Sequence, residues 1–448
     1  GQGTYGVICT TDVADATSPS NSHKLGAIGE MVGQPSDTVT LVFQTGQEVR
    51  VCLGVCDSFG NFLWERPYTI SSGRNPGIDV CARARHVVWE QVDTSAGTEP
   101  DIYYRDLNLR MEPVNISRTW SWSQFPDVCG DDSGVAHIVW EEDIGGKPRI
   151  YYRTFRDNLL GDTFLVSTQV LHYNYRPSIS IFDDGLTVIW QAYDTASRSP
   201  YIIKRRRCVG GIWQREEVLA QDFRPLHNVS LDYSHGSDVF GAAWEDSTVG
   251  PTLDPHFEGG NGTGTRQTPW VSTCPVLATC GATWSYLFWE EDDGGSEDIL
   301  HQMYYFMSGW GGIESMRERW QIAEPIRAPS CLGALAVFTQ GSGPEYKICY
   351  CFMGYPVGLA ERPGQAPRNL TARSHPGRQV TISYVLGQES NVVISLADVQ
   401  GRVQTLLRSG RQPAGRHEFT WHQQIPKGVY LLRIAAGTDY QAQKLVIP

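Results

Sequence analysis

The sequence predicts an all-β protein in which a seven-bladed β-propeller is followed by a small Ig-like β-sandwich. Three observations lead to this fold class. A unit of about fifty residues repeats, each unit holds short apolar runs without helical periodicity, and the repetition stops near residue 360. Repeats of this length are typical of stacked supersecondary units, and four short strands per unit are typical of propeller blades.

An aromatic residue ends an apolar run once in every unit. These seven markers are Phe43, Trp89, Trp140, Trp190, Trp244, Trp289 and Phe338, separated by 46, 51, 50, 54, 45 and 49 residues. A run opened by Pro lies upstream of most markers, as in "NPGIDV", "FPDVCG", "RPSISI" and "RPLHNV". A Gly-containing turn and a run such as "DIYYR" or "RIYYR" lie downstream. With a final run such as "DTFLVS", each unit is expected to supply four strands.

The expected blades bury both faces, because runs such as "IYYR" are apolar at successive positions rather than alternating. The Trp and Tyr columns are therefore expected to pack between blades, with a ligand-stacking column as the alternative. The fifth unit is irregular, since only 25 residues separate Trp244 from Pro269. A ring of six or eight blades is the alternative to seven.

The ring needs a strand to close it, since an open sheet edge invites aggregation. The last unit lacks a clear fourth strand, and the N-terminal "TYGVICTT" is expected to supply it. Cys9 would then lie near Cys349 or Cys351, and a disulfide there would lock the ring.

The chain holds eleven cysteines in no spacing typical of a zinc site. This usage favours an oxidising compartment and disulfides, and the odd number leaves at least one thiol free or paired between chains. No apolar run of about 18 residues predicts a membrane helix. The start at Gly1 is interpreted as a mature N-terminus after removal of a signal peptide.

Charge divides the chain into two parts. Residues 363–448 hold ten Lys and Arg against four Asp and Glu, a charge of +6, so residues 1–362 carry −18 of the total −12. An acidic main body argues against nucleic acid as a partner. We therefore expect a propeller at residues 1–359, a Pro/Gly-rich linker at 360–367 and a separate basic domain at 368–448.

The C-terminal region consists of alternating runs such as "RQVTISYVL", "NVVISLADVQGRVQTLL" and "GVYLLRIAAG", which predict a β-sandwich of about 80 residues. It resembles the sorting domain of type IX secretion substrates and the Ig-like domain of flagellar hook-capping proteins. The matching residues are Asp398, Gly401, Arg402, Gly415, His417, Trp421, Gly428, Val429, Tyr430, Lys444 and Leu445. The resemblance implies export to the cell surface or beyond, with the secretion machinery as a partner. A plain Ig-like spacer is the alternative.

Acidic residues follow the markers: Glu90, Glu141, Glu142, Glu245, Asp246, Glu290 and Glu291, with Gln44, Gln191 and Thr339 in the same column. Two carboxylates can hydrolyse a glycosidic bond. A residue repeated in most blades points instead to the geometry of the repeat, so we expect solvated turn or cap positions. No catalytic, cofactor-binding or metal-binding residue is assigned.

Two charged runs remain. Residues 290–298, "EEDDGGSED", are a candidate for Ca²⁺, although the spacing is not that of an EF-hand loop. Residues 204–207, "KRRR", are expected to form local salt bridges, with docking of a sulfated or acidic glycan as the alternative. The repeats also resemble sialidase-like propellers, but the nearest candidate for an Asp-box, "DSFGNFLW", places Asp57 two residues too far from Trp64.

The sequence therefore favours a non-enzymatic, exported propeller that acts in binding or in assembly of a surface structure. The basic C-terminal domain of one copy would pack on the acidic propeller of the next. The alternative is a glycan-acting enzyme, sialidase-like or another glycoside hydrolase, with its site at the propeller axis. A carboxylate pair or an Arg cluster that breaks the blade symmetry would favour the enzyme.

Overall fold

The computed structural model describes most of the chain. The described residues are 4–12, 23–27, 38–56, 62–81, 83–92, 99–109, 111–131, 133–169, 171–182, 185–234, 239–247, 254–259, 262–266, 268–280, 284–292, 294, 297–305, 309–320, 322, 326–332, 335–340, 345–352, 368–375, 379–386, 390–397, 403–421, 428–436 and 439–447. Within them the strands form nine antiparallel sheets, seven before residue 353 and two after residue 367.

Each of the first seven sheets is named here after its innermost strand. The first three are the β2 sheet with β2 (His23–Ala27), β3 (Thr38–Thr45), β4 (Glu48–Cys56), β5 (Phe62–Trp64) and β6 (Tyr68–Ser72); the β7 sheet with β7 (Arg74–Val80), β8 (Arg85–Val92), β9 (Pro100–Asp106) and β10 (Val114–Asn115); and the β11 sheet with β11 (Trp122–Gly130), β12 (Ala136–Asp143), β13 (Pro148–Arg156), β14 (Leu159–Leu160) and β15 (Phe164–Leu165).

The remaining four sheets follow the same plan. They are the β16 sheet with β16 (Tyr173–Phe182), β17 (Gly185–Tyr193), β18 (Tyr201–Val209), β19 (Ile212–Trp213) and β20 (Glu217–Asp222); the β21 sheet with β21 (Leu226–Ser234), β22 (Val239–Asp246), β23 (Asp254–Gly259) and β24 (Gly262–Thr265); the β25 sheet with β25 (Val271–Cys280), β26 (Trp284–Asp292), β27 (Glu297–Tyr305) and β28 (Gly309–Ser315); and the β29 sheet with β29 (Ile326–Leu332), β30 (Leu335–Gln340), β31 (Glu345–Phe352) and β1 (Thr4–Asp12).

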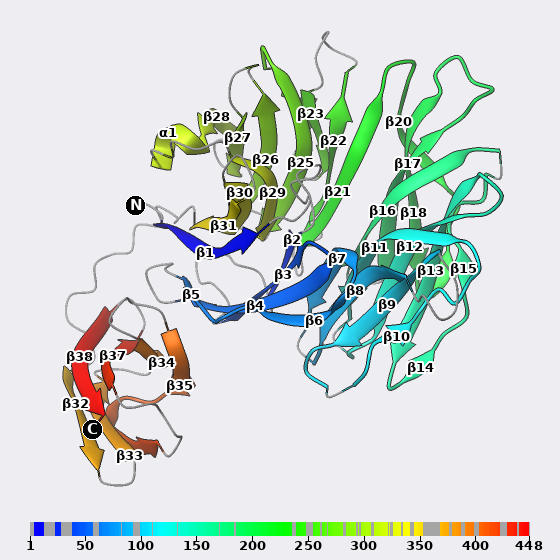
Figure 1. Ribbon diagram of the computed structural model, residues 1–448. Coiled ribbons are helices and arrows are strands. Elements are labelled where there is room, and N and C mark those ends of the chain that lie inside the picture. The colour runs from blue at the N-terminus through cyan, green and yellow to red at the C-terminus, as the bar shows by residue number, and fades with distance from the viewer. Residues whose placement is uncertain are drawn as a thin grey trace.

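The innermost strands contact one another in a closed cycle. Strand β2 meets β7, and the contacts continue through β11, β16, β21, β25 and β29 back to β2. The sheets therefore stand around an axis, as Figure 1 shows, and the protein is an all-β β-propeller. One short helix, α1 (Met316–Trp320), follows β28, and no described helix is long or apolar enough to span a membrane.

The last sheet of the ring combines the two ends of this region. Strand β1 pairs antiparallel with β31, from Thr4 opposite Phe352 to Asp12 opposite Glu345. The backbone of Cys9 lies opposite Ile348, but its side chain is outside the described residues. No disulfide joins two cysteines whose side chains are described, and the Cys349 thiol donates a hydrogen bond to Gln340 Oε1 at 3.1 Å.

The core lies between neighbouring sheets. Trp140 of β12 is fully buried and packs in one cluster with Val88 and Ile102 of the β7 sheet. Trp190 of β17 packs likewise against Val139 and Ile150 of the β11 sheet. Both faces of a sheet are thus buried, which is why the strands are apolar at successive positions. The expectation that the Trp column packs between blades is confirmed.

The C-terminal region forms two sheets around a core of its own. The first sheet is β32 (Arg368–His375), β33 (Gln379–Leu386) and β36 (Gly415–Trp421), and the second is β35 (Val403–Gln412), β34 (Ser390–Ala397), β37 (Gly428–Ala436) and β38 (Asp439–Ile447). Buried Ile382 and Tyr384 of the first sheet cluster with Ile394 and Ile434 of the second. The linker at 360–367, together with Asp398, Gly401 and Arg402, is outside the described residues.

Candidate functional site

A β-bulge interrupts the innermost strand of five consecutive sheets at a residue with left-handed backbone. These residues are Asn75 (φ 48°), Phe125 (φ 50°), Arg176 (φ 46°), Asn228 (φ 46°) and Cys274 (φ 51°). The ladder register shifts at each of them, as between Gln124 and Asp127 in β11. A bulge residue is left outside the ladder, so its N–H needs another acceptor.

The acceptor is the side chain that follows the marker of the preceding sheet. Glu90 Oε1 accepts from Phe125 N at 2.7 Å, Glu141 Oε2 from Arg176 N at 3.1 Å, and Glu245 Oε1 from Cys274 N at 2.8 Å. Two glutamines of the same column play the same role. Gln44 Oε1 accepts from Asn75 N at 3.2 Å, and Gln191 Oε1 accepts from Asn228 N at 2.9 Å. This column therefore ties each sheet to the next.

The expectation of solvated turn or cap positions is wrong for these acids. Glu90, Glu141 and Glu245 are at most 2% exposed. Thr339 is also buried, whereas Glu290 is half-buried. A bulge amide in the interior recruits a side-chain acceptor because an unpaired buried N–H is costly. The expectation that this column serves the geometry of the repeat is confirmed for the three glutamates.

The second position after the marker has a different task. Glu142 Oε2 and Glu291 Oε2 accept from the indole N–H of Trp140 and Trp289, at 3.1 and 3.2 Å, as Gln91 does for Trp89. Burial raises the pKa of Glu142 above its usual value. Asp246 instead accepts a hydrogen bond from Thr265 and lies 3.4 Å from His256 Nδ1.

These contacts leave the fully buried glutamates of the first column without access to a substrate. Burial raises the pKa of Glu141 to about 7, a value suited to proton transfer at neutral pH. Its oxygens, however, accept bonds from Arg176 N and Gln124 Nε2, and the side chain is 1% exposed. A carboxyl group enclosed in this way cannot reach a substrate.

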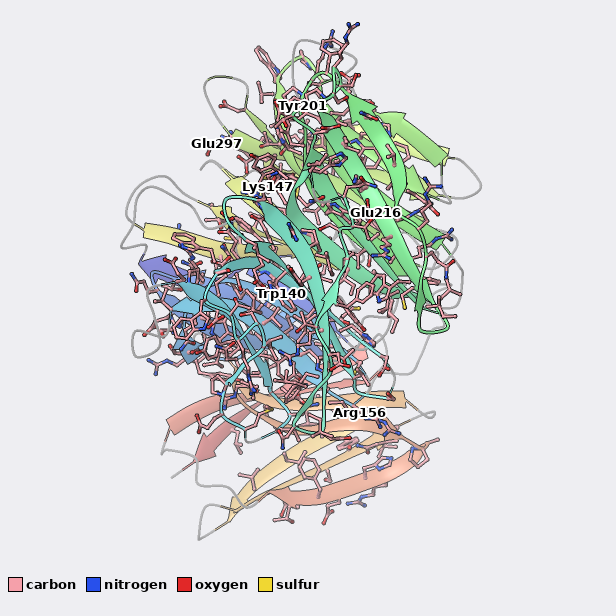
Figure 2. All side chains as sticks on the ribbon, turned by 90° about the vertical axis from the view of Figure 1, so that its right-hand side faces the viewer. Trp140, Lys147, Arg156, Tyr201, Glu216 and Glu297 are labelled. Carbon is pink, nitrogen blue, oxygen red and sulfur yellow. The ribbon has the colours of Figure 1, made fainter. Side chains whose placement is uncertain are left out.

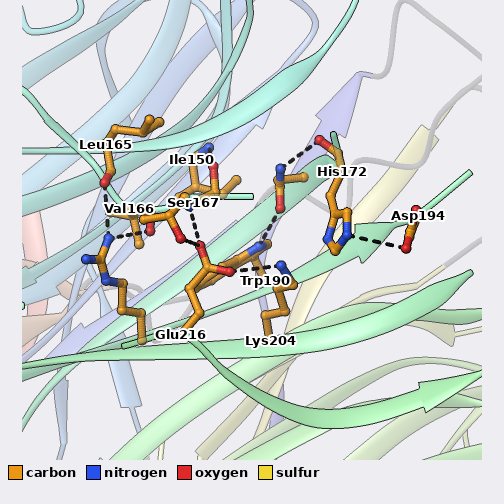
Figure 3. Close-up of polar contacts among 12 residues, drawn as sticks. Ile150, Leu165, Val166, Ser167, His172, Trp190, Asp194, Lys204 and Glu216 are labelled. Atoms are coloured by element: carbon orange, nitrogen blue, oxygen red, sulfur yellow. Dashed lines mark hydrogen bonds and ion pairs between the residues drawn. The ribbon is translucent and has the colours of Figure 1, made fainter. Parts of the chain in front are cut away.

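The basic run at residues 204–207 makes local contacts, as the sequence predicts. Lys204 Nζ lies 2.9 Å from Glu216 Oε2, and both Arg205 and Arg207 pair with Glu217. Arg206 donates to the carbonyl groups of Leu165 and Val166 in the neighbouring sheet (Figure 3).

The carboxylates of residues 290–298 also have structural partners. Glu291 accepts from Trp289, Asp292 Oδ1 from Gly294 N, and Asp298 from Ser315, Ile299 and Arg317. Among the described residues no group of three His, Cys, Asp or Glu side chains is arranged to hold a metal ion. The described part of this run therefore offers no calcium cage.

A cysteine–histidine pair occurs that sequence patterns did not place. Cys81 Sγ lies 3.7 Å from His86 Nε2, and His86 Nδ1 is 2.8 Å from the Tyr104 hydroxyl. Burial lowers the pKa of His86 to about 4 and raises the pKa of Cys81. Both groups are therefore neutral at pH 7, so the pair lacks the thiolate that a nucleophile needs.

The symmetry of the repeat breaks at one end of the β16 sheet. Four tyrosines from three adjacent strands gather there, and we call them the tyrosine patch: Tyr173 and Tyr175 of β16, Tyr193 of β17 and Tyr201 of β18. Tyr193 stands opposite both Tyr173 and Tyr201 in the ladder. Figure 2 shows Tyr201 towards the top of the propeller and Arg156, the last residue of β13, towards its bottom.

The rings of the tyrosine patch lie against one another. The centroids of Tyr173 and Tyr175 are 6.4 Å apart with nearly parallel planes, and those of Tyr193 and Tyr201 are 5.1 Å apart. His227 of the β21 sheet extends the row, 5.7 Å from Tyr201. All four tyrosines are partly exposed, and none of their hydroxyl groups bonds to a residue that the structure describes. The patch thus presents ring faces and hydroxyl groups to solvent.

Other sheets have no such group at the corresponding positions. The β11 sheet carries Trp122, Gln124, Asp143 and Pro148 there, and the β7 sheet carries Arg74, Val92 and Pro100. In the sequence the four tyrosines lie in three separate segments, "YNYR", "QAYD" and "SPYII". Only the strand register brings them together, so no spacing in the sequence predicts the patch.

Further exposed aromatic side chains lie at the start of the innermost strands or on the connections that lead into them. They are Trp120 (89% exposed), Trp122 (48%), Phe223 (61%) and Trp270 (46%). Two of these connections have the same local structure. Thr119 Oγ1 contacts Ser123 Oγ at 3.1 Å in one, and Thr268 Oγ1 contacts Ser272 Oγ at 2.9 Å in the other. Innermost strands begin at the end of the sheets that carries the patch. This end of the sheets therefore carries both the tyrosine patch and these exposed Trp and Phe side chains.

Comparison with known proteins yields distant likenesses. No protein-family model matches the sequence, and no curated protein matches it either. The fold is similar to that of polysaccharide lyase Uly1, at 6% identity and a TM-score of 0.46, with 76% of this chain and 91% of that chain covered.

Two other solved structures are also similar at low identity. They are an endo-arabinase from Bacteroides thetaiotaomicron (13% identity, TM-score 0.36, 58% of this chain and 98% of that chain) and a puromycin-hydrolyzing peptidase from Mycobacterium tuberculosis (11% identity, TM-score 0.45, 77% and 57%). At these values the likenesses transfer no activity to this chain, since propellers host many functions.

Proposed function

We propose that this protein is a non-enzymatic, glycan-binding propeller and that the tyrosine patch is its binding surface. The observation that carries the proposal is the gathering of Tyr173, Tyr175, Tyr193 and Tyr201 in one sheet of an otherwise regular repeat. Structural positions recur from sheet to sheet, whereas this group does not.

The chemistry of the patch suits a sugar. A tyrosine ring offers a flat apolar face and a hydroxyl that both donates and accepts, and it costs little conformational entropy when it is held in place. A pyranose has complementary surfaces, with C–H groups on its faces and hydroxyl groups at its rim. Exposed rings at the same end of the neighbouring β11 sheet, such as Trp120 and Trp122, would extend the apolar surface for a longer chain.

A binding function also agrees with the burial of the glutamates that follow the markers. Hydrolysis of a glycosidic bond needs two accessible carboxyl groups. Glu90, Glu141 and Glu245 are instead enclosed between sheets, where each accepts a hydrogen bond from a bulge amide. This supports binding rather than hydrolysis in that column.

Calorimetric titration with neutral and uronate-containing oligosaccharides tests the proposal. The double variant Tyr173→Ala/Tyr193→Ala is expected to weaken binding about tenfold or more, because each ring contact contributes about 0.5–1.5 kcal/mol. Tyr68→Ala is the matched control, since Tyr68 is 46% exposed on β6 of another sheet. Equal affinity in both variants, or no binding of any oligosaccharide by the wild type, would overturn the proposal.

A glycan-acting enzyme is the second candidate, and His227 is the observation that favours it. Burial is the main cause that lowers the pKa of His227, and the charge of Arg176 adds to it. A neutral imidazole beside the Tyr201 ring could accept a proton during catalysis. If the purified protein depolymerises a bound polysaccharide and His227→Ala abolishes this without loss of affinity, the enzyme is the correct function.

We further propose that the seven sheets are seven blades of one ring and that the C-terminal pair of sheets is an Ig-like domain. The closed cycle of contacts among the innermost strands supports the first statement. The shared core around Tyr384 supports the second. His417, one of the residues of the type IX resemblance, stacks on Tyr384 at 5.3 Å.

We propose export to the cell surface or the medium, with the C-terminal domain engaging the secretion machinery. The resemblance of its motifs supports this. The charge split also supports head-to-tail association, in which the +6 domain of one copy meets the −18 propeller of the next. Light scattering should then detect oligomers that dissociate as salt rises. Monomers at every ionic strength would contradict the association.

A further inference from the structure

We infer that Arg176 selects an anionic group, so that the ligand of the tyrosine patch is an acidic glycan whose carboxylate binds this guanidinium. The inference rests on the proposed function and adds the chemical class of the ligand. Arg176 directly follows Tyr175 at the bulge of β16, so the patch and the cation belong to one stretch of chain.

Arg176 is exposed at this end of the sheets and is held on the innermost strand itself, whereas the exposed Arg118 and Arg198 lie on connections. No described carboxylate lies within ion-pair distance of its guanidinium. Arg74, the exposed arginine one position before the bulge residue of the β7 sheet, is paired instead, with its Nε 2.6 Å from Glu90 Oε2. A cation without a counter-ion, in a region that carries −18, is a feature that a ligand would explain.

Three contacts hold Arg176 in place without neutralising it. Its guanidinium carbon lies 4.7 Å from the centre of the Phe125 ring, and Nη1 donates to Asn228 Oδ1 at 2.7 Å. Its backbone N donates to Glu141. A guanidinium has five N–H donors in a rigid fork, so donors remain for two parallel bonds to a carboxylate. Held on a ring and by an amide, it is pre-organised for such a ligand.

The local charges leave this cation available. Glu141, which accepts from the backbone N of Arg176, has a pKa that burial raises to about 7, so it carries only part of a negative charge near neutral pH. His227, whose pKa the charge of Arg176 helps to lower, is neutral there. Glu245 accepts from Asn228 Nδ2 and from Cys274 N. The site therefore offers one positive charge next to aromatic faces.

The test compares an oligogalacturonate with its carboxyl-reduced, neutral counterpart by calorimetric titration of the full chain. The wild type is expected to bind the charged sugar about tenfold more tightly, because charge-assisted bidentate bonds are about twice as strong as neutral ones. Arg176→Gln should abolish this preference while leaving the affinity for the neutral sugar unchanged. Arg176→Lys should retain part of it, since an ammonium keeps the charge but not the fork.

Arg156→Gln is the matched control. Arg156 is 51% exposed and lies at the opposite end of the strands (Figure 2), where its partner is the adjacent Asp157. This variant should keep the full preference. A sulfated derivative of the carboxyl-reduced oligosaccharide, which is anionic but has no carboxylate, shows whether the site binds a carboxylate or any anion. Tight binding of the sulfated sugar alone would overturn the carboxylate assignment.

The outcomes separate the two proposals. If tyrosine variants weaken binding of both sugars but the wild type shows no preference for the charged one, the inference about Arg176 is wrong and the glycan-binding function stands. If Arg176→Gln weakens both sugars equally, Arg176 is a packing residue rather than a selector. If neither sugar binds the wild type, both proposals fall. Thermal unfolding of each variant, expected at the wild-type temperature, confirms that folding is intact.

Discussion

The β11 and β16 sheets occupy neighbouring places in the ring but solve the same packing problem in different ways. In the β11 sheet Trp140 stacks on Tyr151 with 6.0 Å between centroids, and Glu142 accepts the indole N–H. In the β16 sheet the residue opposite Trp190 is Lys204, and Asn174 Oδ1 accepts the indole N–H at 2.9 Å. Lys204 is 2% exposed and forms an ion pair with Glu216 (Figure 3).

This difference shows which parts of the repeat are interchangeable. The aromatic partner and the acceptor of the indole can both be replaced, provided that every buried polar atom finds another partner. The β16 sheet departs from the repeat on both faces: Lys204 faces the β11 sheet, whereas the tyrosine patch faces His227 of the β21 sheet. Departures concentrated in one sheet indicate a place where selection acted on something other than packing.

The largest expected effect is on the buried ion pair. Lys204→Met should lower the free energy of unfolding by about 3–5 kcal/mol, because Glu216 would remain buried without its counter-ion. Denaturation in urea measures this. The control Lys147→Met, on a connection of the β11 sheet, should cost less than about 1 kcal/mol. A similar small loss for both variants would contradict the role of the pair.

The same pair predicts a dependence on pH. Hydrogen bonds from Lys204 and Thr168 lower the pKa of Glu216 below 4.5, against the opposing effect of burial. A carboxyl whose pKa is lower in the folded state stabilises the protein above its unfolded pKa. This stabilisation should be lost as pH falls below about 4.5 through the folded pKa. Lys204→Met should remove this component, and urea melts from pH 6 to pH 3 would reveal it.

Glu141 should behave in the opposite sense, with a smaller effect. Because burial raises its pKa to about 7, the folded state binds its proton more tightly, and stability should fall as pH rises from about 4.5 to 7. Glu141→Gln should remove this slope and keep the bond to Arg176 N, since Gln44 and Gln191 fill the same role in other sheets. Glu141→Ala should cost about 2–3 kcal/mol by leaving a buried amide unpaired. A slope that persists in Glu141→Gln would refute the assignment.

The ring was predictable from the sequence because its signal is repeated. The markers, such as Trp89 and Trp140, lie on the second strand of their sheets, where apolar runs and turns at fixed spacing predict strands. The Pro that opens the run is not at a fixed ladder position, since in the β21 sheet Val229 takes the place of Pro126 and Pro177, and Pro225 lies four residues earlier.

The roles of the acids and the tyrosine patch were not predictable in the same way. A bulge adds one residue to a strand and turns one amide out of the ladder, and no spacing in the sequence reports where this occurs. Glu90 therefore looked like a turn residue although it is enclosed. The patch depends on the register that sets Tyr173 opposite Tyr193, which lies 20 positions further along the chain.

The smallest effect tests whether the two sheets are interchangeable at the indole. Asn174→Ala should cost about 1–2 kcal/mol, because the buried Trp190 N–H would lose its acceptor. Ala192 occupies the position that Glu142 holds in the β11 sheet, so adding Ala192→Glu should supply a new acceptor and restore part of the loss. Urea denaturation of the single and double variants measures both steps. If adding Ala192→Glu lowers the free energy of unfolding further, the interface around the Lys204–Glu216 pair cannot accept the acceptor that the β11 sheet uses. The β16 sheet would then not be interchangeable with the other sheets at this position.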